Sequence, residues 1–189
     1  MNTTSHSAFK GHELVASGEL AAVLKSVKER FDACPGEPIL IFDDDYGRQV
    51  DFDLSGTVEE VLERALPPAP KPGRGRPALG IRCGEVSLLP RHWDWLQAQQ
   101  GNASATLRRL VDEAIRHEPP AAHAKRRAAA IDKKLMALAG DQPVYEEATR
   151  ALYRGDMEAF RNFARSLPGD LARHFLSLAD GLQALRAGE

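Results

Sequence analysis

The stretch Pro38–Leu54, PILIFDDDYGRQVDFDL, has the pattern of an antiparallel β-hairpin. Residues 38–42 and 49–54 contain the branched and aromatic side chains that favour strands. Between them, residues 43–48 are rich in Asp and Gly, which are common in turns because they tolerate unusual backbone angles and hydrogen-bond their own backbone. The stretch therefore predicts two paired strands joined by an acidic turn.

The acidic turn is also a candidate metal site. Asp43, Asp45 and Asp51 resemble the start of a calcium-binding loop. An EF-hand loop, however, requires a glutamate at its twelfth position, and Leu54 occupies that place. We therefore predict an exposed turn with solvated carboxylates, and no metal site.

Patterns on either side of the hairpin complete an N-terminal unit over residues 1–66. Ala8–Lys10 and Glu13–Ala16 have strand patterns around a short turn. Thr57 and Glu60 have the spacing of a capping box, which predicts a helix after Thr57. We expect an α+β fold with a small antiparallel sheet. A further helix is expected where apolar residues recur at helical spacing, at Leu20, Leu24, Val27 and Phe31.

Charge is distributed unevenly along the 189 residues, although the formal net charge is only −2. Residues 1–66 carry 6 basic and 13 acidic side chains, whereas residues 67–140 carry 13 basic and 6 acidic ones. A basic middle segment can bind a polyanion, or it can dock on acidic parts of its own chain. The sequence leaves both interpretations open.

The segment 67–80, PPAPKPGRGRPALG, predicts an extended linker because Pro and Gly dominate it. Its core, Gly73–Pro77, resembles an AT-hook, a short arm that lays two arginines in the narrow minor groove of A·T-rich DNA. The resemblance implies that Arg74 and Arg76 enter the groove, with Gly75 between them and Pro77 after them. It departs from the usual core at Gly73, where a proline commonly stands. The alternative is a basic linker that aids solubility.

Residues 81–118 have the order strand, proline, helix, turn, helix. The expected strand is Ile81–Leu89, the first helix is Arg91–Gln100, and the second helix is amphipathic with Ser104 as its N-cap. This order resembles the ribbon-helix-helix fold. The resemblance implies a dimer whose paired strands enter the major groove, with Ser104 and Arg108 at a phosphate near the start of the second helix.

The expected strand differs from the strands of that family in the side chains on its outward, DNA-facing side. Counted back from Pro90, the outward residues would be Leu88, Val86 and Gly84, which cannot read base edges through hydrogen bonds. The alternative is a packing or dimerisation module that has lost its reading face.

The C-terminal region, residues 119–189, is expected to be a helical bundle. A helix over His123–Ala139 carries a basic cluster that either is solvated or contacts phosphate. The cluster comprises Lys125, Arg126, Arg127, Lys133 and Lys134. Helices are also expected at 145–153 and around 160–167. The last helix has an apolar stripe at Leu171, Phe175, Leu178, Leu182 and Leu185.

Four segments of the chain resemble the bacterial domain-of-unknown-function family number 2239. They are LIFDDDYGRQVDFDL, GRGRPALG, EVSLLPRHWDWL and GDQPVYEEATRALYRGD. The resemblance covers nearly the whole chain. It implies no activity, substrate or catalytic residue.

The sequence lacks the common signatures of catalysis. It has no GxSxG elbow, Walker loop or HExxH motif, and no Cys/His group with zinc spacing. No stretch is long and apolar enough to span a membrane, and the first residues lack the layout of a signal peptide. The two cysteines lack CxxC spacing and fit a reducing compartment as small buried residues. We therefore expect a cytoplasmic protein.

Together these features predict a non-enzymatic, DNA-binding or DNA-associated regulatory protein that acts as a homodimer, without cofactor, metal or membrane contact. DNA contacts are expected from Arg74 to Pro77, from Ser104 and Arg108, and from Lys125 to Arg127. The alternative is a protein interaction or dimerisation module that binds no nucleic acid and takes an acidic or apolar protein partner.

Overall fold

The computed structural model describes residues 5–66 and 84–188, which form two contact units. The described residues of the first unit are 5–66 and 120–188, and those of the second are 84–119. The AT-hook-like residues and the linker lie outside the described residues. Among the helices of the described residues, none is long and apolar enough to cross a membrane.

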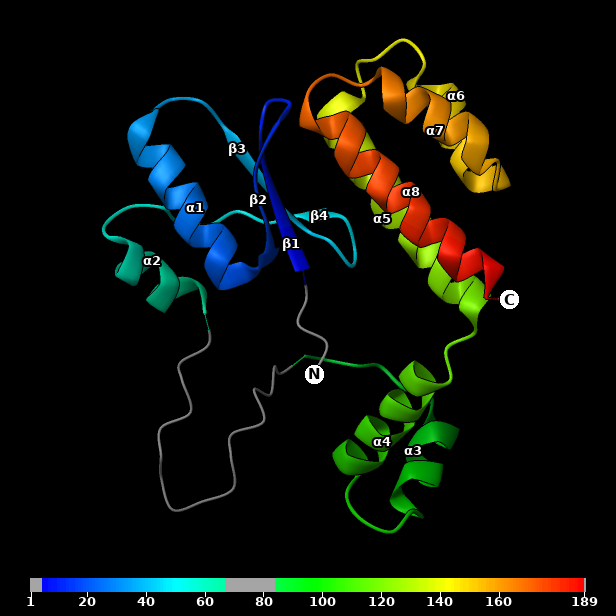
Figure 1. Cartoon of the computed structure of the whole chain (residues 1–189). Helices are drawn as coiled ribbons and strands as arrows, with labels where there is room; N and C mark the ends of the chain where they lie inside the picture. The colour runs from blue at the N-terminus through cyan, green and yellow to red at the C-terminus, as the bar shows by residue number, and fades with distance from the viewer. Residues whose placement is uncertain (1–4, 67–83, 189) are drawn as a thin grey trace. The chain divides into compact units, whose positions relative to one another are not determined.

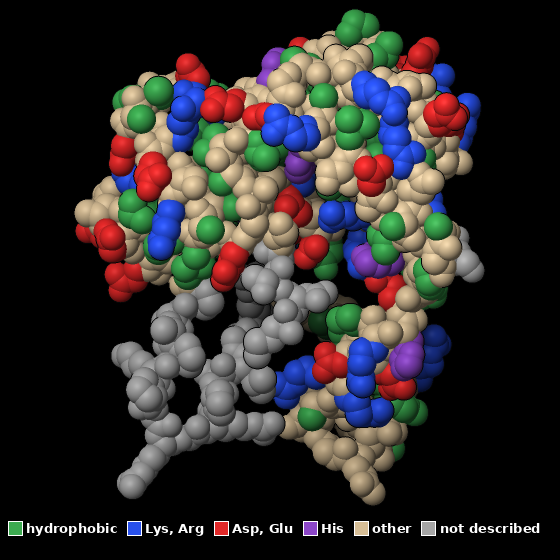
Figure 2. All heavy atoms as spheres, viewed as in Figure 1, with side chains coloured by type: hydrophobic (Ala, Val, Ile, Leu, Met, Phe, Trp, Pro, Cys, Tyr) green, Lys and Arg blue, Asp and Glu red, His purple; other side chains and the backbone are tan. Residues whose placement is uncertain are grey.

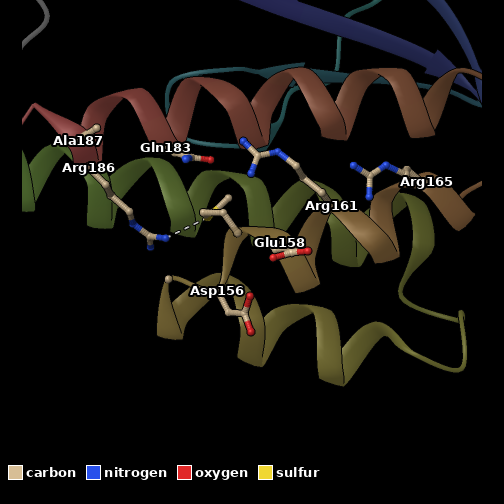
Figure 3. A pocket seen from close by; sticks show the side chains of 9 residues that line it. Asp156, Glu158, Arg161, Arg165, Gln183, Arg186 and Ala187 are labelled. Atoms are coloured by element: carbon tan, nitrogen blue, oxygen red, sulfur yellow. Dashed lines mark hydrogen bonds between the residues drawn. The ribbon is translucent and has the colours of Figure 1, made fainter.

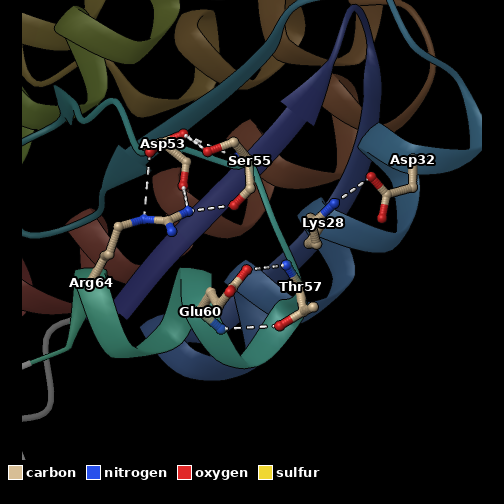
Figure 4. Close-up of polar contacts among 7 residues, drawn as sticks. All are labelled: Lys28, Asp32, Asp53, Ser55, Thr57, Glu60 and Arg64. Atoms are coloured by element: carbon tan, nitrogen blue, oxygen red, sulfur yellow. Dashed lines mark hydrogen bonds and ion pairs between the residues drawn. The ribbon is translucent and has the colours of Figure 1, made fainter.

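The first unit contains a four-stranded antiparallel sheet in the order β2-β1-β3-β4 (Figure 1). The strands are β1 (Ser5–Lys10), β2 (Glu13–Glu19), β3 (Ile39–Asp43) and β4 (Arg48–Gln49). The predicted hairpin around the acidic turn is therefore confirmed. Its second strand is much shorter than the predicted 49–54, because the chain leaves the sheet after Val50, whose backbone N–H still donates to the carbonyl oxygen of Ile41 at 2.8 Å. Arg64 of the following helix donates to the carbonyl oxygens of Asp53 and Ser55 and so fixes the segment that leaves the sheet (Figure 4).

Helices cover both faces of the sheet, so neighbouring residues of its central strands enter different cores. Ala8 and Ile41 pack with α1 (Leu20–Ala33), whereas Phe9 and Phe42 pack with the C-terminal helices. This follows from the strand geometry, in which successive side chains point to opposite faces. Burial on both faces explains why β1 shows no polar alternation: His6 to Phe9 are all buried.

The helix α2 (Val58–Ala65) begins with the predicted capping box (Figure 4). The backbone N–H of Thr57 donates to Glu60 Oε2 at 2.8 Å, and the backbone N–H of Glu60 donates to Thr57 Oγ1 at 3.3 Å. The cap satisfies two backbone donors that the first turn of a helix leaves open. The capping prediction is therefore confirmed.

The C-terminal helices are α5 (Pro120–Ala139), α6 (Tyr145–Arg154), α7 (Met157–Ser166) and α8 (Asp170–Ala187). The predicted stripe of α8 packs into the core: Leu171, Phe175 and Leu182 are buried, and Leu178 and Leu185 pack partly buried against them. The N-terminal sheet is tied to α8 by a hydrogen bond from the backbone N–H of Leu14 to Asp170 Oδ2 at 3.0 Å. The predicted helical region is confirmed, and it completes the first unit.

The second unit is a hairpin of α3 (Pro90–Gln97) and α4 (Ala103–Arg116). The predicted strand is wrong over its described part, since residues 84–89 form no strand. Those residues pair with no neighbouring strand within the described chain, and a lone strand leaves its backbone groups without partners. The ribbon-helix-helix resemblance therefore lacks support from this segment.

Two smaller expectations also change. Asn102, not Ser104, caps α4, with its Oδ1 accepting from the backbone N–H of Ala105 at 2.8 Å. Ser104 lies inside the first turn of α4, where its side chain is exposed. Cys34 was expected to be buried but is exposed, because it follows the end of α1, and Cys83 lies outside the described residues.

Candidate anion-binding site

The acidic turn after β3 is partly buried against α5, so the prediction of solvated carboxylates is wrong for Asp44. This side chain is 11% exposed, and Ser7 Oγ donates to its Oδ1 at 2.7 Å. Lys134, which is 1% exposed, pairs with the same carboxylate and lies 3.2 Å from Ser7 Oγ. A buried ammonium requires such partners because desolvation is costly. Lys134 is therefore neither solvated nor available to phosphate.

The environment shifts the pKa of the buried groups. Burial alone would raise the pKa of Asp44, but the Lys134 ammonium and hydrogen bonds from Lys134 and Ser7 outweigh it and hold that pKa below its ordinary value. Burial lowers the pKa of Lys134, and the Asp44 carboxylate offsets part of this effect. Burial, with repulsion from Lys134, also lowers the pKa of His174 to about 4. His174 packs edge-on to Phe9, with ring centroids 5.0 Å apart.

Other members of the predicted basic cluster also bind this turn. Arg127 Nη1 donates to the carbonyl oxygen of Asp44 at 2.8 Å, and Lys133 Nζ donates to that of Tyr46 at 3.5 Å. The basic helix thus docks on an acidic part of its own chain, which was one of the two interpretations of the charge distribution. Ser7 is fully buried, so the network holds the sheet to α5 and leaves no room for a substrate at its hydroxyl.

Lys125 lies elsewhere on α5, at a pocket of about 420 Å³. Arg154, the last residue of α6, and Arg186, in the last turn of α8, line the same pocket. Three small side chains of α5 at helical spacing give the pocket an apolar side: Ala121, Ala124 and Ala128. The described residues that line it include three cations and no carboxylate. We call this cavity, with its three cations Lys125, Arg154 and Arg186, the basic pocket.

Two hydrogen-bonding arrangements fix the walls of the basic pocket. Arg186 donates from Nη2 to the carbonyl oxygen of Leu152 at 3.0 Å, and its Nη1 lies 3.1 Å from the sulfur of Met157 (Figure 3). Tyr153, which also lines the pocket, donates its hydroxyl hydrogen to Asp132 Oδ2 at 2.9 Å. Tyr145 donates to the other oxygen of Asp132, also at 2.9 Å. The Asp132 carboxylate behind this wall is therefore already bound by tyrosine hydroxyls.

The pKa of Tyr153 reflects the same contact. Burial and the hydrogen bond to the Asp132 carboxylate raise the pKa of Tyr153 to about 12. The phenol consequently keeps its proton at neutral pH and adds no negative charge to the pocket.

A neighbouring pocket of about 670 Å³ shares Gly155 and Arg186 with the basic pocket (Figure 3). Its arginines are already paired: Arg161 with Asp180 at 2.7 Å, and Arg165 with Asn162 Oδ1 at 2.6 Å. Asp156 and Glu158 also line this pocket. Figure 2 shows Lys and Arg side chains over α7 and α8, with acidic side chains among them. The smaller pocket is therefore the more cationic of the two.

Among the described residues, Lys125 is the one predicted site residue that lines the basic pocket. Arg74 to Pro77 lie outside the described residues, and Ser104 and Arg108 belong to the second unit. Arg126 and Arg127 are partly buried on α5, while Lys125 is exposed. Arg154 and Arg186 were missed, because a basic residue in the last turn of a helix is common for electrostatic reasons alone. Among the described residues, no group of three His, Cys, Asp or Glu side chains could hold a metal ion.

The chain was compared with known proteins by family, by sequence and by structure. A family model described as an uncharacterized protein conserved in bacteria, DUF2239, matches residues 5–179. No curated protein and no solved structure matches the chain. The match covers the N-terminal sheet, the α3–α4 hairpin and most of the C-terminal helices, which confirms the resemblance noted in the sequence: the chain belongs to the DUF2239 family.

Proposed function

We propose that this chain is a non-enzymatic, DNA-associated binding protein that contacts phosphate groups through the basic pocket. The observation that supports this proposal is the convergence of Lys125, Arg154 and Arg186 from three helices, with no carboxylate among the described lining residues. Guanidinium and ammonium groups are the usual donors to phosphate oxygens. Contacts of this kind carry no base sequence information and weaken as salt is added.

The Arg74 and Arg76 arm would add contacts of a different kind. Its resemblance to an AT-hook implies insertion into the narrow minor groove of A·T-rich DNA, whose negative potential attracts guanidinium groups. In this proposal the basic pocket supplies sequence-independent attraction, and the arm supplies the preference for A·T-rich duplexes.

The rival function is a protein interaction or dimerisation module that binds no nucleic acid. The observation that favours it is the exposure of large apolar side chains in the second unit, including Val86, Trp95 and Ile115. Exposed apolar patches commonly mark protein interaction sites. The two functions differ in whether the chain binds a DNA duplex at low salt.

The test is fluorescence anisotropy of labelled A·T-rich and G·C-rich duplexes at two salt concentrations. Lys125→Ala/Arg154→Ala should weaken binding to both duplexes and reduce the slope of log affinity against log salt by about 2, roughly one for each phosphate-binding cation removed. Arg74→Ala/Arg76→Ala should remove the preference for the A·T-rich duplex. The control, Lys25→Ala/Arg173→Ala, removes two exposed cations that do not line the basic pocket and should bind like the wild type.

Two outcomes would contradict the proposal. Absence of binding at low salt, where electrostatic attraction is strongest, would leave the protein interaction module as the supported function. Equal loss of affinity in the pocket variant and in the control would show that net charge, not the basic pocket, holds the duplex.

A further inference from the structure

The α3–α4 hairpin leaves most of its apolar surface exposed. Among its described residues, 84–118, only Leu96 and Thr106 have buried side chains. Exposed fractions reach 54% for Val111 and 67% for Ile115 in α4, and 69% for Val86 in the segment before α3. A pair of helices this small cannot bury a sufficient core by itself. The hairpin therefore needs an apolar partner surface.

A groove lies where the two helices meet. It measures about 220 Å³ and is lined mostly by apolar side chains: Leu88, His92, Trp95, Leu96, Leu107 and Leu110. The helix α3 has 8 residues and α4 has 14, which correspond to lengths of about 12 and 21 Å at the rise of an α-helix. The second half of α4, with Val111 and Ile115, thus extends beyond the groove.

The charges of α4 match those of an antiparallel copy of itself. Arg108 and Asp112 lie on the flank next to Val111 and Ile115, since the helical repeat places positions four residues apart on one face. Two antiparallel helices related by a two-fold axis near Val111 would set Arg108 of each copy beside Asp112 of the other. A parallel pair would instead put these flanks on opposite sides of the interface, so the two charges would not meet. Within its own helix, Arg108 Nε donates to the carbonyl oxygen of Ser104 at 3.2 Å.

We propose that this surface binds the same surface of a second copy of the chain, with the two α4 helices antiparallel. The two-fold axis sets Val111 against Val111, and Ile115 of each copy against Leu107 at the edge of the other groove. Such an interface is self-complementary, as closed dimers require. This dimer does not use the paired strands implied by the ribbon-helix-helix resemblance, and it does not depend on DNA binding.

The test is sedimentation velocity of the full chain, without nucleic acid, over a range of protein concentrations. The wild type should sediment as a dimer. Val111→Asp/Ile115→Asp should sediment as a monomer at the same concentrations, while far-UV circular dichroism shows unchanged helix content. The control, Met136→Asp, alters a side chain that is 60% exposed on α5 and should leave the dimer intact.

Charge reversal tests the antiparallel arrangement itself. Arg108→Asp alone and Asp112→Arg alone should each weaken the dimer at least tenfold, because each homodimer then sets like charges together. An equimolar mixture of the two variants should form a heterodimer, since the carboxylate introduced into one chain then faces the guanidinium introduced into the other. If Arg108 instead pairs with Asp112 of its own helix, mixing the two variants should not strengthen their association.

Several results would overturn the inference. A wild type that remains monomeric at about 100 µM would exclude the second copy and leave an apolar segment of another protein as the occupant. A dimer that survives Val111→Asp/Ile115→Asp would place the interface elsewhere. Failure of the mixed variants to associate would exclude the antiparallel arrangement.

Discussion

The carboxylate of Asp44 and the ammonium of Lys134 form a buried ion pair between the turn after β3 and the middle of α5, 90 residues apart in the sequence. The pair joins the sheet to the C-terminal helices, and Ser7 of β1 completes it with a hydrogen bond to the carboxylate. Both partners are largely withdrawn from solvent. Removing one charge of the pair should therefore lower the free energy of unfolding more than replacing both residues with apolar ones.

Lys134→Ala should lower the free energy of unfolding by about 3–5 kcal/mol, because it leaves a buried carboxylate without its counter-charge. Asp44→Leu/Lys134→Met should cost less than the single substitution, since it removes both charges. Lys133→Ala, at the exposed neighbouring position, should change stability by less than about 0.5 kcal/mol. Urea denaturation of the three variants measures these values, and equal losses for Lys134→Ala and Lys133→Ala would refute a buried pair.

Gly47 and Gly11 offer a matched pair of glycine substitutions. Both have a positive φ, +62° and +56°, so alanine at either position should cost roughly 1–2 kcal/mol of backbone strain. A Cβ at Gly47 would also lie 2.1 Å from the backbone oxygen of Ala130, whereas a Cβ at Gly11 would meet nothing within 4 Å. Gly47→Ala should therefore lower the midpoint of thermal unfolding clearly more than Gly11→Ala. Similar shifts for both would mean that the turn moves away from α5 at little cost.

Stability should fall with decreasing pH through the titration of His174. Burial, with repulsion from Lys134, lowers its pKa from 6.5 to about 4, so the unfolded chain binds the proton more readily than the folded chain. The stabilisation is complete above about pH 6.5 and is lost progressively toward pH 4, by up to about 3 kcal/mol. Asp44, with its lowered pKa, adds a further loss below about pH 4.

Urea denaturation between pH 7.5 and 4.5 measures this dependence. His174→Leu should flatten the curve between pH 6.5 and 4.5 relative to the wild type. His12→Leu, at an exposed position, should leave the curve unchanged. An unchanged slope in His174→Leu would show that another group titrates over this range.

Arg186 should contribute to stability as well as to the charge of the basic pocket. Its guanidinium is partly buried and donates to the carbonyl oxygen of Leu152, so Arg186→Ala should cost about 1.5–3 kcal/mol. Arg150→Ala removes an exposed pair with Glu146 four residues away and should cost about 0.3–0.5 kcal/mol. Thermal unfolding of both variants gives the comparison. A loss no larger for Arg186→Ala than for Arg150→Ala would argue against a fixed guanidinium at this wall.

Local sequence patterns were sufficient for most of the first unit. The capping box at Thr57, the apolar stripe of α8 and the hairpin at Pro38–Leu54 each depend on residues close together in the chain, and each appears in the structure. The predicted strand at 81–89 failed over its described part, because a short apolar run has no periodicity that separates a strand from an extended loop. Whether such a run becomes a strand depends on a partner strand.

The site residues were harder to predict, because their roles depend on distant neighbours. Asp44 has the same residue type as the residues before and after it, so the sequence could not indicate which carboxylate meets Lys134. Lys134 follows another lysine and differs from it only in the face of α5 that it occupies. Arg154 and Arg186 meet Lys125 only through the packing of three helices. A single sequence carries no local signal for such a meeting.

The contacts between β1 and the C-terminal helices also constrain the order of events during synthesis. The hydrogen bond between Ser7 and Lys134 joins residues 127 positions apart, and the one between Leu14 and Asp170 joins residues 156 positions apart. Neither can form before its later partner has been synthesised. Until α5 and α8 leave the ribosome, Phe9 and Phe42 have no core to enter, and one face of the nascent sheet stays open to solvent. Contacts this distant in sequence form slowly, and exposed apolar surface invites aggregation. The apolar face of the N-terminal strands therefore stays uncovered during synthesis until α8 has been translated.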